Sequence, residues 1–320
     1  MKKIAIMPVK NEEWILEHNL TCASMFFDHI IVADQNSDDK TPEICKKFPK
    51  VVYIKNTSTK YNEGDRRQLL LDAAREFSGN NFIANLAADE IFSANILEKG
   101  EFERLVKDKN PGTGFSFHWV QLWRSQDKYR DDSSIWSNSY RPFAFIDDRK
   151  TNYKKGFAHL SIIPEDFMEN AIVESRIKVL HYQFVEFDRM LAKQRWARLL
   201  EFGHYTQSNF LKSIILNNKY FITKDENNIK LTNTPQEWQC YYPLFSLDTQ
   251  NDPWHIQASI DFITQYGPEN LKWLDVWDYR WPNFEDKRNF IQKIYHRNQH
   301  LILILNKLIP KKLKDLIKKI

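Results

Sequence analysis

The sequence predicts an α/β fold in which helices flank a mostly parallel sheet, with a helical C-terminal extension. Three observations lead to this prediction. Short apolar runs alternate with amphipathic helical segments over the first ninety residues, the pattern of right-handed strand–helix–strand crossovers. Segments with alternating apolar side chains follow after residue 110, and further helical segments come later. With 320 residues, the chain is long enough for one large domain with an appendage.

The four N-terminal strands are short apolar runs, as expected for strands that are buried on both faces. They are predicted at residues 4–9, 29–34, 51–55 and 81–86, and the helices between them at 12–26, from 41 onward, and at 65–77. Later strands are predicted around 115–119, at 140–146 and at 177–184, and later helices at 188–202 and 252–266. Gly203 and Gly267 are expected to end these last two helices.

Composition argues against several classes of protein. The chain has only eight glycines and contains neither a GxGxxG nor a GxxxxGK[ST] motif, which argues against a dinucleotide-binding or P-loop fold. Cys22, Cys45 and Cys240 lie far apart and form no CxxC pair, so we expect no disulfide framework or zinc knuckle. The N-terminal apolar run is too short for a signal peptide, and no run is long enough to span a bilayer. We therefore expect a cytoplasmic protein.

Positive charge is concentrated at the C-terminal end of the sequence. Residues 306–320 hold six lysines and one aspartate, a charge of +5, whereas the whole chain carries +4, which leaves −1 elsewhere. The tail at 301–320 has leucines and isoleucines at helical spacing opposite its lysines, so it is expected to bind the anionic inner face of a membrane peripherally. A packed terminal helix is the alternative. Nucleic-acid-binding proteins spread basic residues over a body face, and we expect no nucleic-acid partner.

Polar clusters follow three of the predicted strands. They are Val9-Lys10-Asn11-Glu12-Glu13, Asp34-Gln35-Asn36-Ser37-Asp38-Asp39-Lys40-Thr41 and Ala87-Ala88-Asp89-Glu90. Because parallel strands end side by side, and ligands bind at their carboxyl ends, these clusters predict one ligand site.

The three clusters together resemble family 2 glycosyltransferases. That family has a V-[KR]-N-E-E-like turn after its first strand, then an I-I-V-x-D-x-x-S-x-D-x-T segment, and a D-A-D-E-like segment after its fourth strand. The chain matches the first two closely, and in the third Ala87 replaces the first acid. The resemblance implies a GT-A-type fold at residues 1–203, with a nucleotide-binding half at about 1–95 and an acceptor half at about 96–203. A helical extension would then occupy 204–300.

The resemblance also implies an activity, which is transfer of a sugar from a nucleotide-sugar donor to a surface-glycan or lipid-linked acceptor, with inversion. Two alternatives remain open. One is a non-catalytic nucleotide- or sugar-binding relative, made inactive by Ala87. The other is a sugar-phosphate nucleotidyltransferase, which would be expected to carry a Gly- and Arg-rich loop at residues 11–13.

Donor-binding residues are expected at the first two strand ends and at the start of the third helix. The carboxylate of Asp34, at what we expect to be an exposed strand end, could accept hydrogen bonds from uracil or ribose, and the resemblance places it in that role. A turn-opening carboxylate is the alternative. Arginines at a helix N-terminus could meet phosphate, or could be ordinary surface residues. The expected donor-binding set is Val9, Asn11, Glu12, Asp34, Asn36, Arg66, Arg67 and Asp89.

Metal-binding and catalytic roles are expected for a few acids and one histidine. Mg²⁺ or Mn²⁺ prefers carboxylate and phosphate oxygens and neutralises a leaving diphosphate. The resemblance suggests Asp89 as a catalytic and metal-binding residue and His181 as a second metal ligand, although the loss of an acid at Ala87 leaves metal dependence open. A helix-terminal acid and a core histidine are the alternatives. Glu165 and Asp166 are the candidates for the general base that deprotonates the acceptor, and Asp148 is another option. The alternative is that these acids lie in solvated loops.

Overall fold

The computed structural model describes residues 1–58, 61–134, 136–204, 210–220, 229–247, 251–277, 286–298, 304–305 and 307–311. The chain divides into two compact units, here called unit 1 (Met1–Glu186 and Lys230–Gln250) and unit 2 (Phe187–Ile229 and Asn251–Ile320). We expected the first boundary after residue 203. It falls before α5 (Phe187–His204) instead, because this helix packs against α6 and α7 of unit 2.

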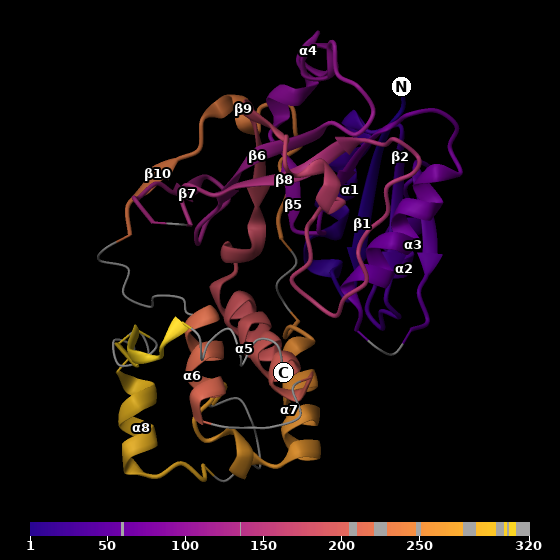
Figure 1. Ribbon diagram of the computed structural model, residues 1–320. Coiled ribbons are helices and arrows are strands. Elements are labelled where there is room, and N and C mark those ends of the chain that lie inside the picture. The colour runs from indigo at the N-terminus through magenta and orange to yellow at the C-terminus, as the bar shows by residue number, and fades with distance from the viewer. Residues whose placement is uncertain are drawn as a thin grey trace. The chain divides into compact units, whose positions relative to one another are not determined.

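Unit 1 is built on an eight-stranded sheet with the order β3-β2-β1-β4-β8-β6-β9-β5 (Figure 1). Its strands are β1 (Lys3–Val9), β2 (His29–Asp34), β3 (Val51–Lys55), β4 (Phe82–Asn85), β5 (Glu90–Phe92), β6 (Gly114–Gln121), β8 (Tyr140–Ile146) and β9 (Ile172–His181). Four of the neighbouring pairs are parallel, namely β3–β2, β2–β1, β1–β4 and β6–β9. The other three pairs are antiparallel. This mostly parallel sheet with flanking helices confirms the predicted fold class.

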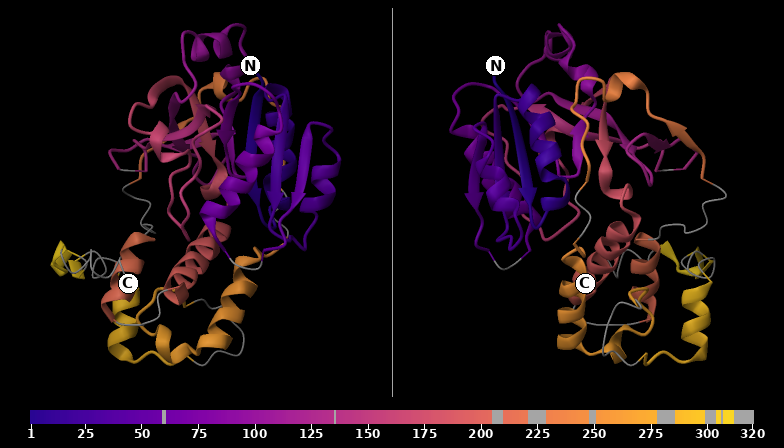
Figure 2. Two further views of the ribbon diagram at one scale, coloured as in Figure 1. Left: turned by 45° about the vertical axis from the view of Figure 1, so that its right-hand side comes forward. Right: turned by 180° about the vertical axis from the view of Figure 1, so that it is seen from behind.

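Helices pack on both faces of the N-terminal half of this sheet. Because side chains alternate along a strand, Ala5 and Met7 of β1 join the core beneath α1 (Glu13–Phe26) and α2 (Thr41–Lys46), whereas Ile4 and Ile6 join the core beneath α3 (Glu63–Arg75). Figure 2 shows these indigo N-terminal strands grouped together in both views. Burial on both faces explains why the strand reads as an unbroken apolar run.

The remaining elements of unit 1 connect or border the sheet. They are η1 (Ala94–Leu97), α4 (Glu101–Val106), β7 (Lys128–Arg130), η2 (Glu165–Phe167), η3 (Tyr182–Phe184), β10 (Leu231–Asn233) and η5 (Gln236–Trp238). Strand β10 pairs with β7 to form a second, two-stranded sheet. Residues 230–250 therefore belong to unit 1 and are not part of a helical extension at 204–300, as we expected, because β10 finds its hydrogen-bonding partner in the first unit. The strand predicted at 177–184 actually ends at His181, where the chain turns into η3.

Unit 2 contains α5, α6 (Phe210–Lys219), α7 (His255–Tyr266), η6 (Pro268–Leu271) and α8 (Phe290–Arg297). We predicted that Gly203 ends α5, but this residue lies within the helix. A Cβ atom at Gly203 would lie 2.6 Å from the ring of Phe262 in α7, so glycine allows these two helices to approach closely. No helix within the described ranges is long and apolar enough to cross a membrane. Most of the predicted helix at 301–320 lies outside the described residues.

Candidate functional site

The sheet brings the three predicted polar clusters to one end, which we call the carboxyl end of the sheet. Val9 at the end of β1 is opposite Asp34 at the end of β2, and β4 ends beside β1 at Asn85. Strands β6 and β9 finish at the same end, where Gln121 is opposite His181. Strand β5 begins there, immediately after Asp89.

The turns that follow β1 and β2 are joined by reciprocal hydrogen bonds. Asn11 Nδ2 donates to Asp38 Oδ1 over 2.6 Å, and the Asp38 backbone N–H donates to Asn11 Oδ1 over 2.9 Å. The Asn11 backbone N–H donates to Ser37 Oγ over 2.7 Å. Asn11 and Asn36 both have positive φ, at 52° and 54°, a conformation that asparagine adopts more readily than most residues. These bonds fix the two turns as one polar surface.

Asp34 is buried rather than exposed as we expected, with 1% of its surface accessible. Its Oδ1 accepts hydrogen bonds from the Ser37 backbone N–H (3.0 Å) and Oγ (2.5 Å), and its Oδ2 accepts from the Tyr53 hydroxyl (2.6 Å). Burial, together with this hydrogen bond, raises the pKa of Tyr53, so its hydroxyl stays protonated and donates. Asp34 therefore orders the turn after β2.

Val9 and Glu12 also take part in local structure. The Val9 side chain lies in the core and its carbonyl accepts from the Gln35 backbone N–H over 2.9 Å. Glu12 Oε2 accepts from Trp14 Nε1 over 2.8 Å, and the Glu12 backbone N–H donates to Thr41 Oγ1 over 3.0 Å. Both residues thus shape the two turns, and Val9 offers no side chain to a ligand.

The two arginines at the start of α3 have different environments. Arg66 Nη1 lies 3.4 Å from Gln35 Oε1, and its guanidinium lies 5.1 Å from the Tyr61 ring, which brings it to the carboxyl end of the sheet. Arg67 is buried, pairs with Glu63 over 2.5 Å and donates to the Ser161 carbonyl. Of the two predicted phosphate-binding arginines, the structure brings only Arg66 to the turns.

Asp89 and His181 face each other at the carboxyl end of β9. Asp89 Oδ2 lies 3.6 Å from His181 Nε2, and both side chains are buried. His181 Nδ1 lies 2.6 Å from Gln121 Oε1, whose orientation is fixed because Gln121 Nε2 donates to the Trp119 carbonyl over 3.1 Å. Nδ1 therefore donates to Gln121 Oε1, and Nε2 is the ring nitrogen that faces a carboxylate oxygen of Asp89. A proton or a cation between the two atoms would satisfy both.

The chemistry of this pair fits a divalent cation that takes its other ligands from substrate. A carboxylate and an imidazole converge, and Mg²⁺ or Mn²⁺ in phosphate-transferring sites takes few protein ligands and several oxygens from phosphate and water. Ala87 supplies no carboxylate, and its backbone N–H donates to Glu90 Oε2 over 2.7 Å. In the part of the chain that the structure describes, no group of three or more potential His, Cys, Asp or Glu ligands surrounds one point.

Sequence reasoning missed Asn19 and Gln121, which hold this pair in place. Asn19 Nδ2 donates to the carbonyls of Ala88 and Glu90, both over 2.9 Å, and lies 3.3 Å from the Ala87 carbonyl. It thereby ties the Asp89 turn to α1. Each residue had a signal in the sequence. Asn19 is an amide on the apolar face of the first helix, and Gln121 is an amide at the next inward-facing position of the strand predicted around 115–119.

Glu165 and Asp166 are not brought to Asp89. Glu165 forms an ion pair with Lys154, and the two acids line a separate pocket with residues 159–161 and 168–169. The adjoining Phe167 packs on Gly114, at the start of β6. The carboxyl end of β6 is seven residues farther on, roughly 23 Å along the strand. The structure therefore gives no support to these acids as the general base.

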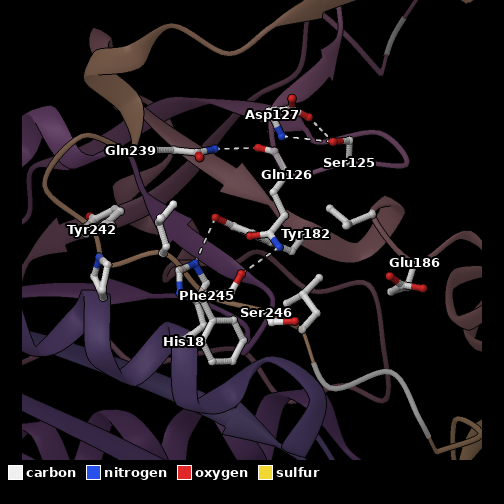
Figure 3. Close-up of a pocket in the computed structure, with 14 residues that line it drawn as sticks. His18, Ser125, Gln126, Asp127, Tyr182, Glu186, Gln239, Tyr242, Phe245 and Ser246 are labelled. Carbon is white, nitrogen blue, oxygen red and sulfur yellow. Dashed lines mark hydrogen bonds between the residues drawn. The ribbon is translucent and has the colours of Figure 1, made fainter.

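A different pocket, of about 660 Å³, lies beside α1 (Figure 3). His18 lies 3.2 Å from the Tyr182 hydroxyl and stacks on the Phe245 ring at 4.8 Å. Among the described residues, the lining of this pocket includes the carboxylates of Asp127 and Glu186 but no lysine or arginine. A diphosphate would meet no positive side chain there, so this pocket does not suit the nucleotide. Part of the pocket wall comes from residues 239–247, which lie in unit 1 and not in the expected helical extension.

The N-terminal half of the chain matches a known protein family. Residues 4–159 match the family model described as glycosyl transferase family 2. The chain therefore contains a family 2 glycosyltransferase domain, which confirms the predicted family and the predicted enzyme class, a glycosyltransferase. No curated protein sequence matches the chain.

Solved structures show more distant likeness. S. aureus TarS is 14% identical with a TM-score of 0.40, covering 86% of this chain and 50% of that one, so the chain spans half the length of that structure. S. aureus TarS 1-349 in complex with UDP is 13% identical with a TM-score of 0.38, covering 94% and 88%. A 4-diphosphocytidyl-2C-methyl-D-erythritol synthase is 17% identical with a TM-score of 0.28, covering 45% and 75%.

Proposed function

We propose that the chain transfers a sugar, with inversion, from a nucleoside-diphosphate sugar to a hydroxyl group of a surface-glycan or lipid-linked acceptor. One observation supports this proposal. The turns after β1 and β2, which reciprocal hydrogen bonds join (the interlocked turns), lie at the same end of the sheet as the Asp89–His181 pair. Polar atoms of residues 10–13 and 35–38 would meet the base and ribose. Arg66 and the Asp89–His181 pair would meet the diphosphate.

Asp89 and His181 would hold a divalent cation against the diphosphate, and Gln121 would keep the His181 ring in the tautomer that presents Nε2. A bound Mg²⁺ or Mn²⁺ would offset the negative charge that develops on the leaving diphosphate. Because Ala87 provides no second carboxylate, we expect weak binding of the ion without nucleotide and tighter binding with it. Titration of Mn²⁺ in the presence and absence of a nucleoside diphosphate measures this difference.

The proposal is tested with a panel of UDP-, GDP-, CDP-, ADP- and dTDP-sugars, with donor hydrolysis and transfer to glycan acceptors as readouts. We expect turnover of one donor class. Nucleotide binding without turnover would favour the non-catalytic alternative, which the alanine at position 87 supports. Release of pyrophosphate from a nucleoside triphosphate and a sugar 1-phosphate would instead identify a nucleotidyltransferase.

The basic tail at 301–320 would keep the protein at the anionic inner surface of a membrane, near lipid-linked acceptors. This part of the proposal rests on the six lysines after residue 305, each worth about 1 kcal/mol near such a surface. Peripheral binding of this kind needs no spanning helix.

A further inference from the structure

A row of side chains crosses four neighbouring strands at the carboxyl end of the sheet. Arg141 lies on β8, Trp119 on β6, His181 on β9 and Glu90 on β5, in the order in which these strands are paired. The Arg141 guanidinium lies 4.2 Å from the centre of the Trp119 ring, and this ring stacks on His181 at 4.4 Å. Trp119 thus links Arg141 to the imidazole that faces Asp89.

Among the residues that the structure describes, no acid neutralises the positive charge of Arg141 by direct contact. Among the described residues, no carboxylate lies within ion-pairing distance of its guanidinium, and its Nε donates to Ser139 Oγ over 3.3 Å. The residue is exposed. Desolvation by the atoms packed around the guanidinium lowers the pKa of Arg141, and the charge of Glu90 opposes that shift. An arginine remains charged under these conditions, and a guanidinium fixed on a ring presents its terminal N–H groups in one plane.

The path of the chain places this charge near the altered acidic motif. Strand β4 ends at Asn85 and β5 begins at Glu90, and the strands β8, β6 and β9 lie between them in the sheet. The segment 86–89 therefore connects two strands of the sheet between which the strand with Arg141 lies. Glu90, which interacts electrostatically with Arg141, also accepts the hydrogen bond from the Ala87 backbone N–H.

We propose that Arg141 binds the diphosphate of the donor. Its positive charge would there replace part of the charge of a metal ion that acids at both positions 87 and 89 would hold. Planar guanidinium groups bind phosphate oxygens in pairs of charge-assisted hydrogen bonds. The inference rests on the proposed function, because it needs a nucleoside-diphosphate donor. It explains how a site with alanine at position 87 stabilises a leaving diphosphate.

The test compares a nucleoside diphosphate with its nucleoside. The full chain is titrated calorimetrically with UDP, GDP, CDP, ADP and dTDP, and then with the nucleoside of whichever nucleotide binds. Arg141→Gln is expected to weaken diphosphate binding roughly tenfold or more and to leave nucleoside binding unchanged. Arg141→Lys should give an intermediate loss, because it keeps the charge but not the paired hydrogen bonds. Melting temperatures establish that both variants fold.

Arg176→Gln is the matched control. Arg176 is also an exposed arginine of this sheet, but it lies on β9 away from His181 and pairs with Glu101 over 3.0 Å. Its loss should leave diphosphate affinity unchanged. Equal affinities of wild type and Arg141→Gln would overturn the inference and leave the proposed function standing. If the wild-type chain binds no nucleoside diphosphate, the proposed function fails, and this inference fails with it.

A second measurement tests the compensation itself. In an Ala87→Asp background with Mn²⁺, the added acid should strengthen metal binding, so that Arg141→Gln weakens diphosphate binding by a smaller factor than in the wild-type background. The same factor in both backgrounds would contradict the idea that Arg141 compensates for the missing acid.

Discussion

The effect of the negative charge of Asp89 on turnover can be separated from the effect of its side-chain shape. Asp89→Asn keeps the size of the side chain but removes the charge that faces His181 Nε2 at 3.6 Å. We expect turnover to fall roughly a hundredfold or more, while the melting temperature changes by only a few degrees. Steady-state kinetics with the active donor and a thermal melt provide the measurements. Full activity in Asp89→Asn would move the reaction centre away from this pair.

Asp34 illustrates a residue whose binding and structural roles cannot be separated by truncation. Asp34→Ala removes the acceptor for Ser37 and for the Tyr53 hydroxyl, so we expect a loss of about 1–3 kcal/mol in the free energy of unfolding. We also expect weaker nucleotide binding, because the turn after β2 loses its order. Denaturant unfolding and calorimetry measure the two effects. Unchanged nucleotide affinity in a destabilised variant would show that the turn does not contact the nucleotide.

The interlocked turns are a feature of two connecting elements rather than of one residue. Asn11→Gly keeps the positive φ accessible but removes the side-chain bonds to Asp38, whereas Asn11→Ala loses both. We expect the alanine variant to be less stable than the glycine variant by about 1 kcal/mol, and both to bind nucleotide more weakly than wild type. Denaturant midpoints rank the stabilities. Equal stability of the two variants would mean that the backbone of this turn relaxes freely.

Helix α1 contains a buried titratable group that makes stability depend on pH. Burial lowers the pKa of His18 from 6.5 to about 4, so between these values the unfolded chain binds a proton that the folded chain does not. Stability should therefore fall as pH decreases through this window. His18→Gln should reduce the difference in unfolding free energy between pH 7 and pH 5 by about 2 kcal/mol. Other histidines stay in place in both proteins, so an unchanged difference would mean that His18 does not titrate in this way.

At the scale of the whole molecule, the question is whether the basic tail brings the protein to a membrane. A truncation before residue 301 would also remove Ile309, which is buried against Ile214 and Tyr295 in unit 2. A truncation after Lys311 keeps this contact and removes four of the six lysines that follow residue 305. We expect the full chain, but not the truncated one, to sediment with anionic vesicles, and salt to release part of it. Equal sedimentation of both proteins would mean that the tail does not bind the membrane and is a packed terminal helix.

The sequence by itself determined the fold class, the first three strands and the three polar clusters. Each of these depends on local patterns, because a strand buried on both faces is an apolar run and a ligand-binding strand end is followed by polar residues. By resemblance, the sequence also predicted that Asp89 and His181, which are 92 positions apart, act in one site.

Only the tertiary structure decided which of these residues lie together. Burial of Asp34, the remote position of Glu165, the support of His181 by Gln121 and the stacking of Arg141 on Trp119 all depend on which strands are neighbours. Strand β5 is three residues long, too short for a periodic pattern, yet it places Asp89 beside His181. Gly203 matched a helix-ending signal but serves close packing against Phe262. Local patterns do not specify these contacts, because they form between segments that are distant in the sequence.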